Sequence, residues 1–147
     1  MVPVDKNQPT SALGTSYNGT FSSDVSTIYN FDIPASDAGK TCTLVFLLPN
    51  KQDLQTSDYT LSGTGGIDVK GLTAPADQGT SFSNVPAVSS DVGSVENVAP
   101  GNSYTISSGA CAAGQRIGYE VSATGSLSMN YFQDYNPSPL GLYITVC

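Results

Sequence analysis

The sequence contains no histidine and no tryptophan among its 147 residues. Without histidine the chain cannot form a Ser-His-Asp or Cys-His nucleophilic site, a histidine-ligated zinc site, or a copper site that needs an N-terminal histidine. The stretch Gly63-Thr64-Gly65-Gly66 lacks the third glycine of a dinucleotide fingerprint and opens no helix, which indicates a turn. We therefore expect no cofactor and none of these enzyme classes.

Charge is also scarce, because only 12% of the residues are charged, against roughly 25% in typical soluble domains. Five basic and twelve acidic side chains give a net charge of -7. A negative chain repels phosphate backbones and anionic lipid surfaces, so we expect no nucleic acid partner. A polar surface built mainly from Ser, Thr, Asn and Gly favours a secreted or cell-surface β protein.

Long apolar runs are absent as well. The longest, residues 44–48, has the length of a strand and falls far short of the roughly 18 residues of a membrane span, so we expect no membrane insertion. Residues 1–5 lack the basic and apolar regions of a signal peptide. We expect a mature chain whose Met1 was added for expression.

The local pattern predicts strands and almost no helix, because Gly, Pro, Ser and Thr interrupt nearly every window of three helical turns. Short runs bounded by turn residues place the expected strands at 26–33, 41–48, 59–61, 67–69, 103–107, 117–123, 127–132 and 142–146. Several short strands without helical crossovers predict an all-β, single-domain antiparallel β-sandwich of jelly-roll or immunoglobulin-like type.

Two features predict how these strands are arranged. Residues 44–48 are apolar on both faces, which predicts a central strand covered on both sides. Residues 117–123 and 127–132 alternate with period two around Thr124-Gly125-Ser126, which predicts a hairpin.

The expected domain organisation is a flexible N-terminal segment over residues 1–14 and a β-sandwich domain over residues 15–147. Between residues 73 and 100, three prolines and many small polar side chains predict a long surface excursion that could include one edge strand.

Carboxylates are the remaining candidates for catalysis, since glycoside hydrolysis needs only two of them. Asp32, Asp68, Glu120 and Asp134 lie near predicted strands but are scattered along the chain. Solvated acids, or acids that hydrogen-bond to turn amides, are the more common outcome in such a sequence. We predict that the protein is not an enzyme, with a carboxylate-based glycoside hydrolase as the catalytic alternative.

Aromatic and amide side chains gather near the C-terminus, a combination that sugar sites often use. The candidate ligand-binding residues are Tyr131, Gln133, Asp134, Tyr135 and Asn136. Core packing of Tyr131 or Phe132 is the competing interpretation, and the lack of tryptophan weakens the aromatic platform. Asp134 and Asn136 could also offer oxygens to calcium, but no calcium-loop motif is present and we predict no metal site.

Three cysteines, Cys42, Cys111 and Cys147, allow one disulfide and leave one thiol, and their spacing does not decide the pairing. We favour Cys42 with Cys147, because the strands that hold them would then run antiparallel as neighbours. Cys111 would be free or paired elsewhere. No C-x-x-C motif indicates zinc or redox chemistry.

The stretch Asn18-Gly19-Thr20 is the only N-glycosylation sequon of the sequence. Asn18 is therefore the glycosylation candidate. Together with the low charge, this sequon modestly favours the secretory route.

Three longer stretches point to a family: residues 42–49 (CTLVFLLP), 100–106 (PGNSYTI) and 131–144 (YFQDYNPSPLGLYI). Together they resemble the fungal C-terminal domain family named after the fission-yeast Uba-three-binding protein But-two, commonly met in secreted or cell-wall-associated proteins. The resemblance covers roughly residues 26–147 and implies no established catalytic residues. The partner in the family name belongs to the interior of the cell and to one member, so we do not extend it to this chain.

These observations predict a secreted or cell-wall-associated, non-enzymatic fungal β-sandwich protein with a structural or adhesion role. One alternative is a lectin-like glycan-binding module, and another is a secreted effector that binds a host or microbial protein through residues 73–100. The expected partners are cell-wall polysaccharide, glycoprotein or another extracellular protein, and the expected location is extracellular or in the cell wall.

Overall fold

The computed structural model describes residues 1–16, 18–50, 52, 59–133 and 140–147. The strands in these ranges are β1 (Val2–Asp5), β2 (Asn18–Phe21), β3 (Val25–Asp32), β4 (Thr41–Leu48), β5 (Tyr59–Ser62), β6 (Ile67–Leu72), β7 (Val88–Val95), β8 (Asn102–Ala110), β9 (Arg116–Ala123), β10 (Ser128–Phe132) and β11 (Gly141–Val146). Two single-turn 3-10 helices, η1 (Ala35–Asp37) and η3 (Phe82–Asn84), interrupt them. Within the described ranges, no helix is long and apolar enough to cross a membrane. The all-β prediction is confirmed.

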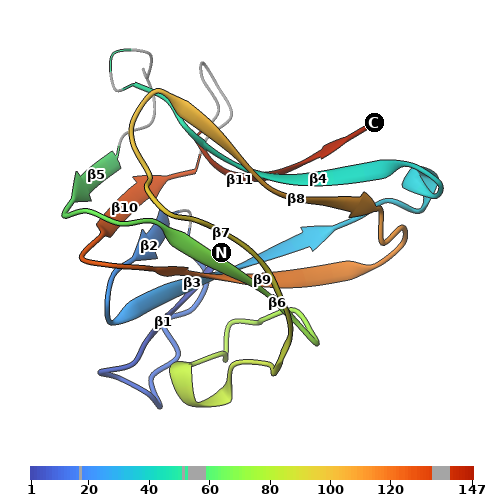
Figure 1. Ribbon diagram of the computed structural model, residues 1–147. Coiled ribbons are helices and arrows are strands. Elements are labelled where there is room, and N and C mark those ends of the chain that lie inside the picture. Colours follow the sequence, from blue (N-terminus) through green and yellow to red (C-terminus); the bar gives the residue numbers. More distant parts are fainter. Residues whose placement is uncertain (17, 51, 53–58, 134–139) are drawn as a thin grey trace.

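The strands form three antiparallel sheets in a sandwich-like arrangement (Figure 1). A five-stranded sheet of order β1-β3-β9-β6-β7 faces a three-stranded sheet of order β11-β4-β8. The third sheet, of order β2-β10-β5, lies at one end of the sandwich. The predicted antiparallel β architecture is thus confirmed.

The alternation of β4 places one of its faces in the core between the sheets. Leu44, Phe46 and Leu48 are buried, whereas Val45 and Leu47 are half-buried. The strand is central in its sheet, as predicted, but its second face is covered only in part. Burial of each large apolar side chain contributes about 1.5–3 kcal/mol, so the inner face dominates the stability of this strand.

Three aromatic rings from different strands meet in this core. Phe21 of β2 lies 6.0 Å from Phe46 and 5.8 Å from Tyr131 between ring centroids, and Phe46 lies 6.0 Å from Tyr131. Such spacings are typical of favourable edge and tilted ring contacts. The rings connect the β2-β10-β5 sheet to the β11-β4-β8 sheet.

A second apolar cluster lies on the outer face of the five-stranded sheet. Val2 and Val4 pack there with Ile28, Leu72 and Ala76. The first two belong to β1, which pairs with β3. Residues 2–5 of the segment predicted to be flexible (1–14) are therefore a strand, because their alternating valines fill the space between β3 and the 73–87 loop.

The expected hairpin between residues 117–123 and 127–132 is not formed. β9 pairs with β3 and β6, whereas β10 pairs with β2 and β5. The link at 124–126 crosses between sheets and hydrogen-bonds the 63–66 turn, with Thr124 N–H donating to Gly66 O at 2.9 Å. Period two predicts which face of a strand is buried but not which neighbour it pairs with.

The predicted excursion at 73–100 contains β7, the edge strand of the five-stranded sheet. Gly93 of β7 lies so close to β8 that a Cβ atom there would be 2.6 Å from the carbonyl oxygen of Ile106. Only glycine allows this approach, which closes one side of the sandwich.

The disulfide joins Cys42 to Cys111, with 4.9 Å between their Cα atoms, so the expected pairing of Cys42 with Cys147 is wrong. β11 does pair with β4 as predicted, but Cys147 lies opposite Thr41 in that ladder, with backbone hydrogen bonds of 2.9 and 3.0 Å. Successive side chains of a strand point to opposite faces. Cys147 therefore faces away from Cys42, whereas Cys111 lies diagonally across from it on the same face, two residues beyond Gly109.

Replacing Cys111 with Ser is expected to lower the free energy of unfolding. The bond closes a loop with a sequence separation of 69, and loop entropy predicts a loss of about 4 kcal/mol. The matched variant Cys147→Ser should change the value by less than about 0.5 kcal/mol. Urea unfolding measures both. A disulfide-linked peptide containing Cys147 in a non-reducing map would contradict the assignment.

Candidate functional site

The residues predicted to bind a ligand are only partly placed. Tyr131 is fully buried, Gln133 is half-buried, and Phe132 is 40% exposed. The other three candidates, Asp134, Tyr135 and Asn136, lie outside the described residues. The ring of Tyr131 belongs to the core, so it cannot serve as a sugar platform.

A chain of hydrogen bonds starts at two buried tyrosines. The hydroxyl groups of Tyr29 on β3 and Tyr131 on β10 are hydrogen-bonded to each other. Tyr131 also donates to the Oε1 atom of Gln133 at 2.9 Å. Gln133 Nε2 in turn donates to the Leu142 carbonyl oxygen at 2.9 Å, and the Leu142 N–H donates to Oε1 at 3.3 Å. The Gln133 amide thus pairs with the edge of β11 as a neighbouring peptide would.

Both tyrosines in this chain stay protonated at neutral pH. Burial raises the pKa of Tyr29 well above its usual value, and the neighbouring Tyr131 adds to the effect. Burial also raises the pKa of Tyr131. A phenol that holds its proton this tightly is no general base. This chain of hydrogen bonds therefore stabilises the structure rather than transferring protons.

The hydroxyl pair leaves no room for a side chain on the strand beside it. A Cβ atom on Gly19 of β2 would overlap the Tyr131 ring and would lie 2.6 Å from the Tyr29 hydroxyl oxygen. Gly19 lies opposite Tyr131 in the β2–β10 ladder. Packing therefore requires glycine at position 19, the middle residue of the sequon.

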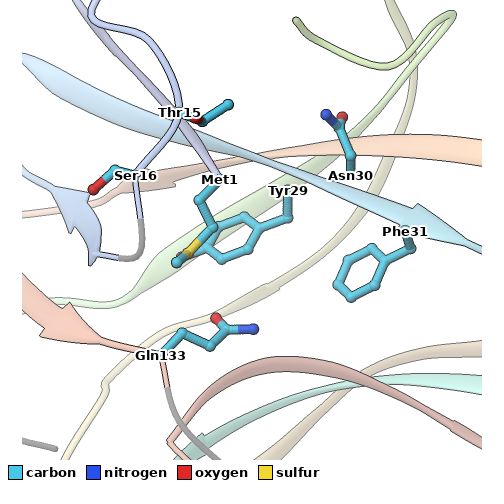
Figure 2. A pocket seen from close by; sticks show the side chains of 7 residues that line it. All are labelled: Met1, Thr15, Ser16, Tyr29, Asn30, Phe31 and Gln133. Atoms are coloured by element: carbon cyan, nitrogen blue, oxygen red, sulfur yellow. The ribbon is translucent and has the colours of Figure 1, made fainter. Parts of the chain in front are cut away.

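A cavity of about 420 Å³ lies next to this chain (Figure 2). It is lined by Met1, Thr15, Ser16, Tyr29, Asn30, Phe31 and Gln133. Figure 2 shows the Tyr29 and Phe31 rings on one side of β3 and the Asn30 amide on the other. That amide is bound to the backbone of Ala76, at 2.8 and 3.0 Å.

None of the described residues that line the cavity has a charged side chain, but Met1 also carries the terminal amino group, whose pKa is lowered by burial and by Arg116. Thr15 and Ser16 supply hydroxyl groups, and Ser16 Oγ already accepts the Asn18 N–H at 3.0 Å. The volume falls within the roughly 300–1,000 Å³ of ligand pockets. The cavity is therefore large enough for a small molecule.

The three described carboxylates among those singled out by the sequence do not line this cavity. Asp32 is exposed and lies 3.7 Å from Arg116, and Glu120 accepts a hydrogen bond from Ser26 at 3.0 Å. Asp68 lies 3.9 Å from Lys70. The fourth acid, Asp134, is outside the described residues. The three placed acids have structural partners.

A shallower hollow of about 180 Å³ on the outer face does include two acids, Asp24 and Glu120. Asp24 pairs with Lys6 at 3.3 Å, and Glu120 holds the Ser26 hydroxyl as described above. Both carboxylates are thus partnered, as in a structural surface network rather than an acid–base pair.

The comparison with family models decides the family. Residues 1–137 match the family described as the Ubiquitin 3 binding protein But2 C-terminal domain. The chain belongs to this family. The match confirms the resemblance seen in the sequence and begins earlier, so β1 is part of the matched region. No curated protein matches the chain.

Asn18 and Cys147 of this But2 C-terminal domain are both accessible. Asn18 is the exposed first residue of β2, an edge strand of its sheet. Cys147 is an exposed free thiol. An exposed sequon on an edge strand leaves room for a glycan, so glycosylation of Asn18 remains our prediction.

The sequence did not single out Tyr29 as the partner of Tyr131. In the sequence, Tyr29 and Phe31 alternate with polar residues, a pattern typical of a strand with one buried face. The hydroxyl contact, however, spans 102 residues of sequence. Such a contact follows from how the sheets pack, so no local pattern could indicate it.

Replacing Gln133 with Leu should destabilise this But2 domain. The change removes the acceptor of the Tyr131 hydroxyl, which keeps its bond to Tyr29, and leaves both backbone groups of Leu142 without the Gln133 amide, at a cost of about 2–4 kcal/mol. Gln115→Leu is the matched control, because that side chain is exposed. Chemical denaturation compares the two variants, and amide exchange at Leu142 should quicken only in the first. Equal stability of both variants would show that the amide is dispensable.

Replacing Asp68 with Asn should change how stability depends on pH. Burial raises the pKa of Asp68 above 3.8, with Asp91 adding to the shift and Lys70 opposing it. The folded state therefore holds this proton to higher pH than the unfolded state does, and ionisation costs stability as pH rises through that interval.

Asn mimics the protonated acid, so Asp68→Asn should gain stability over the natural chain between acidic and neutral pH. Asp32→Asn, whose acid is 81% exposed, should show no such gain. Urea unfolding at a series of pH values measures the difference. If the free energies of unfolding of Asp68→Asn and of the natural chain differ by the same amount at every pH, the raised pKa of Asp68 is refuted.

Proposed function

We propose that this But2 domain is a secreted or cell-wall-associated β-sandwich without enzymatic activity, with a structural or adhesion role. The observation that supports this most is that no acidic side chain is among the described residues that line the 420 Å³ cavity beside Gln133. Catalysis by carboxylates needs two acids facing one substrate. In the described part of the chain, Asp32 pairs with Arg116, Glu120 accepts the Ser26 hydroxyl, and Asp68 lies beside both Lys70 and Asp91.

Three features support an extracellular location. The Cys42–Cys111 disulfide is of a kind that persists in oxidising compartments. The sequon residue Asn18 is exposed. The chain has only 12% charged residues, so its surface is made of small polar groups.

A lectin-like role is a second candidate, because the cavity beside Gln133 is large enough for a small neutral ligand. The burial of Tyr131 argues against this role, because the aromatic face that the sequence suggested is not accessible to a sugar.

A protein partner is a third candidate. Phe82 is 46% exposed and Val88 is 49% exposed, and both belong to the 73–100 excursion. Exposed apolar side chains of this size can anchor a protein contact. The family description names a protein that binds ubiquitin 3, which agrees with a binding role in general.

The proposal predicts that the purified protein sediments with isolated fungal cell walls and releases no reducing sugar from them. Asp32→Asn serves as the matched acid control. Released sugar that disappears in Asp68→Asn or Glu120→Gln, but not in Asp32→Asn, would sink the non-enzymatic assignment. Failure to sediment with walls would count against adhesion.

A further inference from the structure

A further hollow of the sandwich is lined by described residues of β4, β6, β7, β8, β9 and β11, with no lining residue from the β2-β10-β5 sheet among them. Two adjoining spaces of about 150 and 400 Å³ lie there between the five-stranded sheet and the β11-β4-β8 sheet. They share Ser107, Ala112, Ile117 and Tyr119. We call the combined space the inter-sheet groove.

Tyr119 is the central side chain of this groove. It lies between Tyr29 of β3 and Gly71 of β6 in the strand ladders. Gly71 has no side chain, and side-chain atoms of β7 lie 3.2–3.4 Å from where its Cβ atom would be. Gly71 and Tyr119 both line the larger of the two spaces. The ring of Phe31 supports the Tyr119 ring edge-on at 5.9 Å between centroids.

The hydroxyl of Tyr119 has no hydrogen-bond partner among the described residues. The side chain is half-buried, and this burial raises its pKa. Half-buried hydroxyls of this kind usually find a partner. The other large hydroxyls of the core differ, since Tyr29 and Tyr131 are bonded to each other. The Tyr119 hydroxyl is thus available to a ligand.

Serine hydroxyls face the same space from two other strands. Ser107 of β8 lies opposite the buried Leu44, which places it on the inner face. Ser90 of β7 lies opposite Gly71, and its Oγ would be 3.2 Å from a Cβ atom there. The groove therefore offers hydroxyls from both sheets.

Irregular pairing occurs in the ladders that bear these serines. The β4–β8 register shifts at Leu44 and Val45, beside Ser107. The β6–β7 register shifts at Gly71 and Leu72, beside Ser90. Bulges redirect side chains and are enriched next to functional sites. Both shifts occur at the groove.

The lining of the groove is uncharged throughout the described residues, and aliphatic side chains such as Ile33, Leu44 and Ile144 line its smaller part. A phosphate or carboxylate ligand would find no countercharge here. A purely apolar ligand would bury the serine and tyrosine hydroxyls without partners, at a cost of about 1–3 kcal/mol each. A ligand with both C–H faces and hydroxyl groups fits both parts of the lining.

We propose that the inter-sheet groove binds a neutral carbohydrate chain, with the Tyr119 hydroxyl as its central hydrogen-bonding group. The groove is distinct from the cavity beside Gln133, and Tyr119 was not among the candidates of the sequence. The inference adds a site to the proposed adhesion role but does not need it, because a carbohydrate can bind in solution without any cell wall.

The test is a titration of the ¹⁵N-labelled full chain with neutral oligosaccharides, followed by NMR. The probes are hexamers of β-1,3-linked glucose, β-1,4-linked glucose, β-1,4-linked N-acetylglucosamine and α-1,6-linked mannose. At least one should shift the amides of Ser107, Ala112 and Tyr119 at millimolar concentration. Tyr119→Phe should weaken that affinity about tenfold, because only the hydroxyl is lost.

Tyr104→Phe is the matched control, since the Tyr104 hydroxyl contacts the backbone of Ala99 instead of the groove. It should bind like the natural chain. Ala112→Leu fills the part shared by both spaces and should abolish binding, with Ala113→Leu as its control. Thermal melts verify that each variant is folded.

The proposal is overturned if no probe shifts the groove amides, if shifts are confined to Gln133 and Phe31, or if Tyr119→Phe binds as well as the natural chain. Binding of laurate in the groove without any saccharide binding would overturn it too. Loss of oligosaccharide binding in Tyr119→Phe with unchanged sedimentation on cell walls would support the groove and place adhesion elsewhere on the surface.

Discussion

One buried chain of hydrogen bonds connects all three sheets of this protein. Tyr29 belongs to the five-stranded sheet, Tyr131 to the end sheet, and Gln133 reaches the Leu142 backbone in the third sheet. A buried polar group without a partner costs more than a typical hydrogen bond contributes, so each member of the chain constrains the next. The relative placement of the sheets, and with it the packing of Phe21 and Phe46, depends on this chain.

The same arrangement explains why the two ends of the sandwich differ. At the end with Tyr131, aromatic rings from three strands fill the space between the sheets. At the other end, the small residues Gly71 and Ala112 line a space between the sheets, and the disulfide ties β4 to the end of β8. A close-packed interior leaves no room for a ligand, whereas small residues between diverging sheets do. The dense end fixes the fold, and the open end holds the groove that includes Tyr119.

Membership in the But2 C-terminal domain family is consistent with a binding role. The placed acids agree with this view, because Asp32, Asp68 and Glu120 each have a partner other than a substrate. The hydroxyl groups are divided between two tasks. Those of Tyr29 and Tyr131 hold the fold together, and that of Tyr119 is left for a ligand.

The sequence by itself determined the all-β class with antiparallel strands and the family, because strand periodicity, turn residues and short sequence motifs are local features. It could not determine the partner of each strand, so the hairpin at 124–126 and the disulfide to Cys147 were predicted wrongly. Cys42 has a neighbouring strand on each side, and only the register shows that Cys111 shares its face while Cys147 does not. The contact of Tyr29 with Tyr131 and the open space beside Tyr119 likewise depend on residues far apart in sequence. Tertiary packing alone decides such contacts, because their geometry is set by how whole sheets meet.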